Sequence, residues 1–336
     1  MIGGIGNVMT DTEHSLPVDA LVCASEQHYY GGQAVIEGVM MRGRRFWGLA
    51  VRQPDGGIVR RSYELSDPGA RFPILKWPMI RGVLALWDSM SLGIRALNIS
   101  ANLSLEGTGT AEEPAPQLGA REMAVTVTIA LLIGVGLFVV IPLLVARWFG
   151  PALSNAILFN LVEGIVRIAI FLAYIVGVSL LPDLRRVFEY HGAEHKVINA
   201  YEAGRPLEPQ SVKAFSTLHP RCGTAFLLVV MVLAILVLAL VGKPPLVWLI
   251  VSRIVGIPVV AGLAYEVIRF AGRHRDGIVA RVLLGPGLGL QKLTTRQPSD
   301  AQVEVAAAAL QEVLRLEAGG EPASDPAGTV VMEQAT

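Results

Sequence analysis

The stretch GTAFLLVVMVLAILVLALVG, residues 223–242, decides the fold because it contains no charged side chain. A helix needs about 20 predominantly apolar residues to cross a hydrocarbon core of about 30 Å. Three further apolar segments of comparable length lie at about 123–146, 156–181 and 246–268. Hydrophobic residues make up 52% of the chain, and the mean hydropathy is +0.51. The sequence therefore predicts a mainly α-helical integral membrane protein with about four transmembrane helices.

Composition also limits the partners. The 28 basic and 28 acidic residues cancel, so no nucleic-acid partner is expected, whereas membrane lipids are. The two cysteines, Cys23 and Cys222, lie far apart, which favours a reducing compartment over a disulfide framework. The N-terminal residues lack the pattern of a secretory signal peptide.

The distribution of basic residues predicts the orientation. Eleven lysines and arginines precede the first apolar segment, six lie in 182–222 and seven follow the fourth segment, whereas the other two loops offer only Arg147 and Lys243. Because basic loops stay in the cytosol, we expect a multi-pass protein of the cytoplasmic membrane with both termini cytosolic.

Two of the expected spans carry charges. Glu163 and Arg167 lie one helical turn apart in the second, and the fourth contains Arg253 and Glu266. Such residues are expected to face protein or a wet cavity. The simplest interpretation of Glu163 and Arg167 is a mutually neutralising pair, and a functional role is the alternative.

A small antiparallel β unit is predicted before the membrane domain. The stretches AVIEGVMM (34–41), FWGLAVRQ (46–53) and GIVRRSYEL (57–65) have strand character, and Pro54-Asp55-Gly56-Gly57 marks a hairpin. Near the C-terminus, an amphipathic helix is expected to begin at Ser299 or Asp300 and to dock on the membrane or the β unit. The expected organisation is a flexible leader (1–28), the cytosolic β unit (29–72), interfacial or re-entrant helices (73–105), a linker (106–120), the membrane domain (121–270) with a cytosolic loop (182–222), a C-terminal segment (271–317) and a disordered tail (318–336).

The motif His191-Gly192-Ala193-Glu194-His195 carries the sharpest chemical signal. On a helix, the two histidines share a face and can reach one metal ion. This H-x-x-E-H order is that of the inverted zincins, in which the glutamate is a general base. Glu194 is therefore a candidate catalytic residue.

A second cluster, His219-Pro220-Arg221-Cys222, immediately precedes the third span. Together with His191 and His195, His219 and Cys222 complete a possible tetrahedral zinc site. Four protein ligands would favour a structural role, whereas three histidines without Cys222 would leave a position open for catalysis. A third alternative has no metal, with the histidines only forming hydrogen bonds.

The glycine-dense stretch Gly31–Gly43 surrounds a single carboxylate, Glu37. It lacks a phosphate-loop pattern, so a tightly turned β strand is the simplest interpretation. Glu37 stays a candidate extra ligand or catalytic base. Thr294, Thr295 and Arg296 are candidates for contact with an anion or a lipid head group.

Four stretches of this sequence resemble a known family: YGGQAVIEGVMMRG, LPDLRRVFEYHGAEHKVINAYEAG, LHPRCGTAFLL and PGLGLQKLTTRQP. In content and order they resemble the bacterial YqhQ family, a domain of unknown function often described as predicted metal-dependent enzymes. The resemblance runs from about Tyr29 to about Leu316 and departs mainly at the two ends. It implies that the residues matching its motifs belong together: His191, Glu194, His195, His219 and Cys222.

Three hypotheses about function follow. The first is a cytosol-facing membrane metalloprotein that acts as a zinc-dependent hydrolase, in which His191 and His195 bind zinc and Glu194 acts on water. The second is a non-enzymatic scaffold or membrane-protein biogenesis factor stapled by structural zinc. The third is a transporter or channel that uses the charged faces of the spans, which could form a path as a homo-oligomer.

Overall fold

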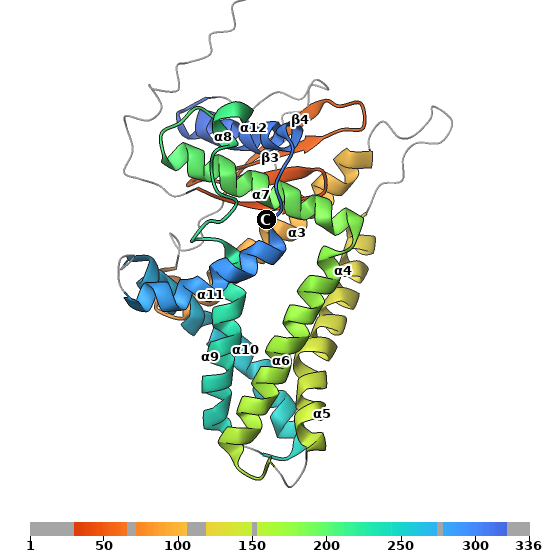
Figure 1. Ribbon diagram of the computed structural model, residues 1–336, viewed down its shortest axis with the longest axis vertical. Helices are drawn as coiled ribbons and strands as arrows, with labels where there is room; N and C mark the ends of the chain where they lie inside the picture. Colours follow the sequence, from red (N-terminus) through yellow and green to blue (C-terminus); the bar gives the residue numbers. More distant parts are fainter. Residues whose placement is uncertain are drawn as a thin grey trace, which may run out of the picture.

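The computed structural model describes residues 30–65, 72–105, 119–149, 153–242, 244–273 and 278–320. The leader at 1–28, most of the linker at 106–120 and most of the tail at 318–336 lie outside the described residues. A small α/β domain sits at one end of a bundle of long helices (Figure 1). We call this part the sheet domain and the opposite end of the bundle the far end.

Among the described residues, four helices are long and apolar enough to span a membrane, as the sequence predicts. The first span is continuous but changes its winding, from α4 (Ala120–Val135) through a π-helical segment η2 (Gly136–Val140) into α5 (Ile141–Trp148). The other three are α6 (Ala156–Ser179), α9 (Gly223–Val241) and α10 (Leu246–Arg273). The C-terminal ends of α5 and α9 and the N-terminal ends of α6 and α10 lie at the far end (Figure 1).

The sheet domain is built on four antiparallel strands in the order β1-β2-β3-β4, which confirms the predicted β unit. The strands are β1 (Gly31–Val35), β2 (Gly38–Arg42), β3 (Phe46–Arg52) and β4 (Ile58–Glu64). In the register, Val35 pairs with Gly38, Arg42 with Trp47, and Arg52 with Ile58. The glycine-dense stretch is thus a hairpin of two strands, with its turn at Ile36 and Glu37, rather than one strand.

Alternation along the strands gives the sheet two apolar faces. Val39, Met41 and Ala50 face α7 (Pro182–Glu202) and α12 (Asp300–Glu317), which lie side by side. Met40 and Leu49 belong to the opposite core, against α3 (Ile80–Leu105). The domain therefore has three layers, with α7 and α12 on one face and α3 on the other.

The amphipathic C-terminal helix docks on the sheet. Its N-cap Ser299 and Gln302 form a capping box, which satisfies the first free N–H groups of α12. Val303, Val305 and Leu310 of this helix are buried in the core shared with α7 and the sheet. A core built from both ends of the chain thus closes the sheet domain.

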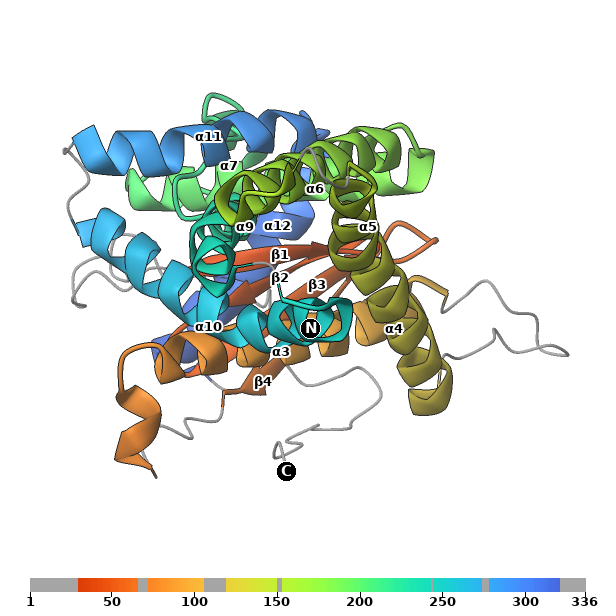
Figure 2. The ribbon, with the colours of Figure 1, turned by 90° about the horizontal axis from the view of Figure 1, so that it is seen from below.

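Helix α3 joins the two parts of the molecule, because it packs on the sheet and on α10, and three further helices complete the fold. A 3₁₀ helix, η1 (Pro73–Lys76), precedes α3, whose first turns pack on α10 through the ion pair of Arg81 with Glu266. The short α8 (Pro209–Val212) and the longer α11 (Ile278–Thr294) follow α7 and α10, respectively. Seen from below, α3 lies along α10, while α11 extends beside α9 (Figure 2).

Candidate metal centre

Helix α7 places the two histidines of the H-x-x-E-H motif on one face. The helix begins with Pro182 at its first positions and has Asp183 in the first turn, where an acidic residue complements the helix dipole. His191 and His195 are one turn apart, and their ring centroids are 4.4 Å from each other. His195 is 1% exposed, whereas His191 is only half-buried.

Backbone carbonyls fix the orientation of both rings. Nδ1 of His191 lies 2.8 Å from the carbonyl oxygen of Thr294, and Nδ1 of His195 lies 2.6 Å from that of Thr217. Because a carbonyl oxygen only accepts, each Nδ1 carries the proton and donates it. In a neutral ring with its proton on Nδ1, Nε2 has the lone pair with which a histidine binds a metal ion, and a carbonyl on Nδ1 is a common partner of such histidines.

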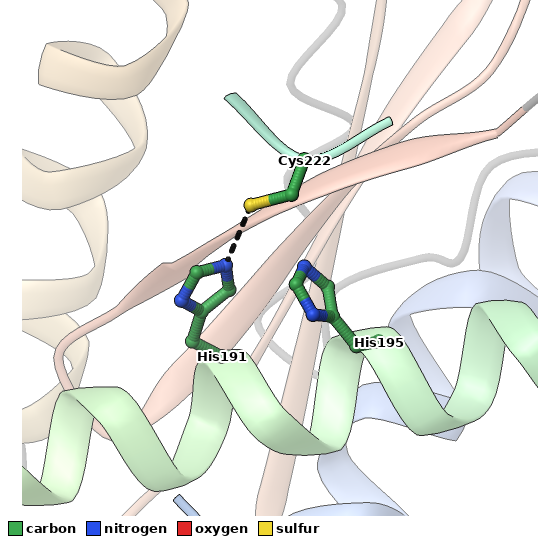
Figure 3. A group of neighbouring side chains, drawn as sticks. All are labelled: His191, His195 and Cys222. Carbon is green, nitrogen blue, oxygen red and sulfur yellow. Dashed lines mark hydrogen bonds between the residues drawn. The ribbon is translucent and has the colours of Figure 1, made fainter. Parts of the chain in front are cut away.

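The thiol of Cys222 faces these lone pairs. Cys222 is the N-cap residue of α9, and its Sγ lies 3.2 Å from Nε2 of His191, to which the thiol donates. One ligand atom from each of His191, His195 and Cys222 lies within 4.8 Å of the others (Figure 3). Zinc lies 2.0–2.1 Å from nitrogen and about 2.3 Å from sulfur, so these three groups form a candidate N₂S metal site.

His219 is next to this group but outside it. Its ring centroid is 5.7 Å from that of His195, and its Nε2 accepts from Arg221 at 3.3 Å and lies 3.7 Å from Glu202. The amide of Gln291 bonds to both the N–H and the C=O of His219, at 2.9 and 2.8 Å. The structure thus brings together three of the four predicted ligands. The ring of the fourth, His219, faces the ion pair of Arg221 and Glu202 instead.

Glu194 lies on the sheet side of α7. A Cβ placed on Gly32 would be 2.9 Å from the carboxyl carbon of Glu194, so strand β1 covers this side chain closely. Burial raises the pKa of Glu194, while His191, His219 and the Gly32 N–H lower it. The carboxylate does not belong to the group of three ligand atoms in the part of the chain that the structure describes.

Glu37 clamps the β1–β2 turn to α7. Its carboxylate accepts two bonds from the guanidinium of Arg186 and one from the hydroxyl of Tyr190, at 3.2 Å. The backbone of Glu37 is left-handed, with φ at 52°, a conformation that costs a residue with a Cβ. These contacts engage the whole carboxylate, and among the described residues Glu37 is not grouped with the metal-binding atoms.

Two features of this centre were not predicted from the sequence. The first is the pair of carbonyls from Thr217 and Thr294, which come from distant segments and carry no side-chain signal. The second is Gly192, where an added Cβ would lie 1.9 Å from the carbonyl oxygen of Arg296. Only glycine allows residues 294–296 to approach α7 closely enough for the Thr294 carbonyl to form its hydrogen bond with Nδ1 of His191.

Comparison with known proteins matches this chain to one family and one relative of unknown function. A family profile described as "Protein of unknown function (DUF1385)" matches residues 77–316. The "Uncharacterized protein YqhQ" of Bacillus subtilis (strain 168) is 36% identical over 310 residues, which cover 90% of this chain and 97% of the relative. No solved structure matches the chain.

Proposed function

The chain belongs to the DUF1385 family, which includes YqhQ, and we propose that it is a zinc-binding membrane protein whose metal centre works as a hydrolytic site. The observation that carries the proposal is the shared tautomer of His191 and His195. Two imidazoles whose Nδ1 atoms face carbonyl oxygens, together with one thiol, form a donor set suited to zinc.

The number of ligands favours an open site. Catalytic zinc sites combine three protein ligands with one position for water or substrate, whereas structural sites have four protein ligands. Among the described residues, the group contains three ligands, and both His191 and Cys222 are half-buried rather than sealed. Bound zinc would supply Lewis acidity toward a substrate oxygen and lower the pKa of water.

The chain's own residues have separate roles in this proposal. Thr294 and Thr217 hold the two rings, and the Thr224 hydroxyl, 3.2 Å from Sγ of Cys222, supports the sulfur. Glu194 is the proton acceptor, as the buried carboxylate whose charge interacts with His191 and His219. The basic loops favour an orientation with the sheet domain in the cytosol, which gives the site cytosolic substrates.

The first test is metal analysis of the detergent-purified protein. We expect about one zinc per chain in the wild type, loss in His195→Ala and Cys222→Ser, and retention in Glu194→Gln. Cobalt substitution then reports on the open position. Cyanide should change the visible spectrum of the cobalt protein if a position is open, and an unchanged spectrum would contradict the hydrolytic proposal.

A structural zinc is the second candidate, and one observation favours it. The centre joins three segments: α7 through the histidines, α9 through Cys222, and the end of α11 through the Thr294 carbonyl. A zinc ion here would fasten the sheet domain to the membrane helices. In that case, Cys222→Ser should lower the thermal stability strongly while cyanide leaves the cobalt spectrum unchanged.

A further inference from the structure

Helices α6 and α10 bury a second polar centre, between the membrane spans. Glu163 and Arg253 are 1% and 3% exposed, and Asn160 is 2% exposed. The side chain of Arg167 is 10% exposed. None of these residues takes part in the metal centre described above. Ionisable groups buried at such positions mark binding or transport sites in membrane proteins more often than packing alone.

A network of short bonds holds the cluster together. The Glu163 carboxylate accepts from Nη2 of Arg167 at 2.5 Å and from Nε and Nη2 of Arg253 at 3.1 and 2.5 Å. Nη2 of Arg253 also donates to the Asn160 side chain at 2.6 Å. One carboxylate thus serves two guanidinium groups.

The cluster carries an unbalanced charge. Two arginines and one glutamate sum to a net charge of +1 (two positive charges minus one negative). The other acidic residues within the candidate spans are Glu122 and Glu266. Glu122 lies in the first turn of α4, and Glu266 pairs with Arg81, so both lie toward the sheet-domain ends of their spans. They do not neutralise the excess positive charge.

The guanidinium of Arg167 has more N–H groups than its hydrogen bonds use. Its recorded bonds run from Nε to the carbonyl of Phe138, at 2.7 Å, and from Nη2 to Glu163. Among the described residues, Nη1 of Arg167 has no hydrogen-bond partner, although nine-tenths of the side chain is buried. A guanidinium with a free N–H group at the edge of a largely buried cluster is suited to an anion.

The π-helical segment is an independent sign of function at the same place. Phe138, whose carbonyl accepts from Arg167, is the central residue of η2 (Gly136–Val140). Short π segments inside α-helices occur frequently at functional sites. Here the altered winding presents a main-chain acceptor to Arg167, which fixes the side chain while leaving Nη1 uncommitted.

The depth of the cluster suggests access from the far end. At a rise of about 1.5 Å per residue, Asn160 and Arg167 lie roughly 7 and 18 Å along α6 from its N-cap. Asn160 also donates to the carbonyl of Gly242, which caps α9 at the far end. In the proposed orientation, the Asn160 end of the cluster is directed toward the external side of the membrane, and Arg167 lies near the middle of the 24-residue α6.

We propose that this cluster binds one monovalent inorganic anion of the halide class. One negative charge would cancel the net charge of +1, and Arg167 Nη1 would donate to the anion. The metal centre is independent of this site, so failure of one proposal leaves the other standing.

The test is thermal unfolding of the purified protein with chloride replacing gluconate at constant ionic strength, in the presence of EDTA. We expect the wild-type Tm to rise with chloride and to saturate. Arg167→Gln leaves one arginine beside one glutamate, so its Tm should be independent of chloride. The matched control is Arg60→Gln, an exposed arginine on β4, which should keep the wild-type response.

Two results would overturn the proposal: a wild-type Tm that is equal in chloride and gluconate, or an unchanged chloride response in folded Arg167→Gln. If Arg167→Gln does not fold, Arg167→Lys serves instead. It keeps the charge but replaces the planar donors, so the chloride midpoint should shift to higher concentration. An unchanged midpoint in Arg167→Lys would likewise overturn the proposal.

Discussion

The two buried polar centres of this protein are built in opposite ways. At the metal centre, protons are directed outward to the carbonyls of Thr294 and Thr217, so that lone pairs converge. In the membrane cluster, N–H donors from two arginines converge on the single carboxylate of Glu163, so the positive charge exceeds the negative charge. The difference teaches that hydrogen bonds at the edge of a site decide which sign of ligand its centre can accept.

The largest expected effect comes from the carboxylate of the membrane cluster. Glu163→Gln leaves Arg167 and Arg253 side by side without a counter-charge, and removing one partner of a buried ion pair costs about 3–5 kcal/mol. Reversible unfolding in mixed micelles measures this loss. Arg167→Gln, which keeps a neutral pair, should cost less; an equal loss would contradict the charge argument.

Zinc should produce the next largest effect. If the ion binds only the folded chain, zinc at 100 times its Kd stabilises the protein by about 2.7 kcal/mol. Thermal unfolding with zinc and with EDTA gives this difference. It should disappear in Cys222→Ser, and its persistence there would exclude the thiol as a ligand.

Gly192→Ala tests whether the backbone shapes the metal centre. The added Cβ would overlap the Arg296 carbonyl, and overpacking of this kind costs about 1–3 kcal/mol. Displacement of residues 294–296 should also weaken zinc binding, which a competition titration with a chelator would measure. Gly289→Ala on α11 has open space at its Cβ and serves as the control, with unchanged zinc affinity.

The smallest effect is expected at His219. Its Nε2 faces Arg221 and Glu202, so His219→Gln should retain the wild-type zinc content in elemental analysis. Loss of zinc in this variant would show that His219 is a fourth ligand and that the site is closed. The comparison between the two centres would then change, because the metal centre would have no open position.

The sequence predicts the elements better than their contacts. The apolar lengths predict all four spans, the turn residues at 54–57 predict one hairpin, and the periodicity after Ser299 predicts α12. The turn at Ile36 and Glu37 was missed because no turn residue marks it. Arg186 and Tyr190, from a helix far along the chain, hold it instead.

At the candidate site, too, the sequence predicts local groupings but not contacts between distant segments. Spacing alone groups His191 with His195, because both lie on one helix, and the three-residue spacing between His219 and Cys222 suggests Cys222 as a ligand. The positions of Glu194 and His219 depend on which face of α7 meets the sheet and on Gln291 of α11. Those are contacts between distant segments, and local pattern carries no information about them.

The packing of α12 on the sheet also has a consequence for biosynthesis. The four strands are translated first, but the helices that cover Val39, Met41 and Ala50 come from residues 182–202 and 300–317. All four spans are therefore synthesised before one face of the sheet can be covered completely. The sheet domain can therefore close only after α12 has been synthesised, and one apolar face of the sheet stays partly uncovered until then.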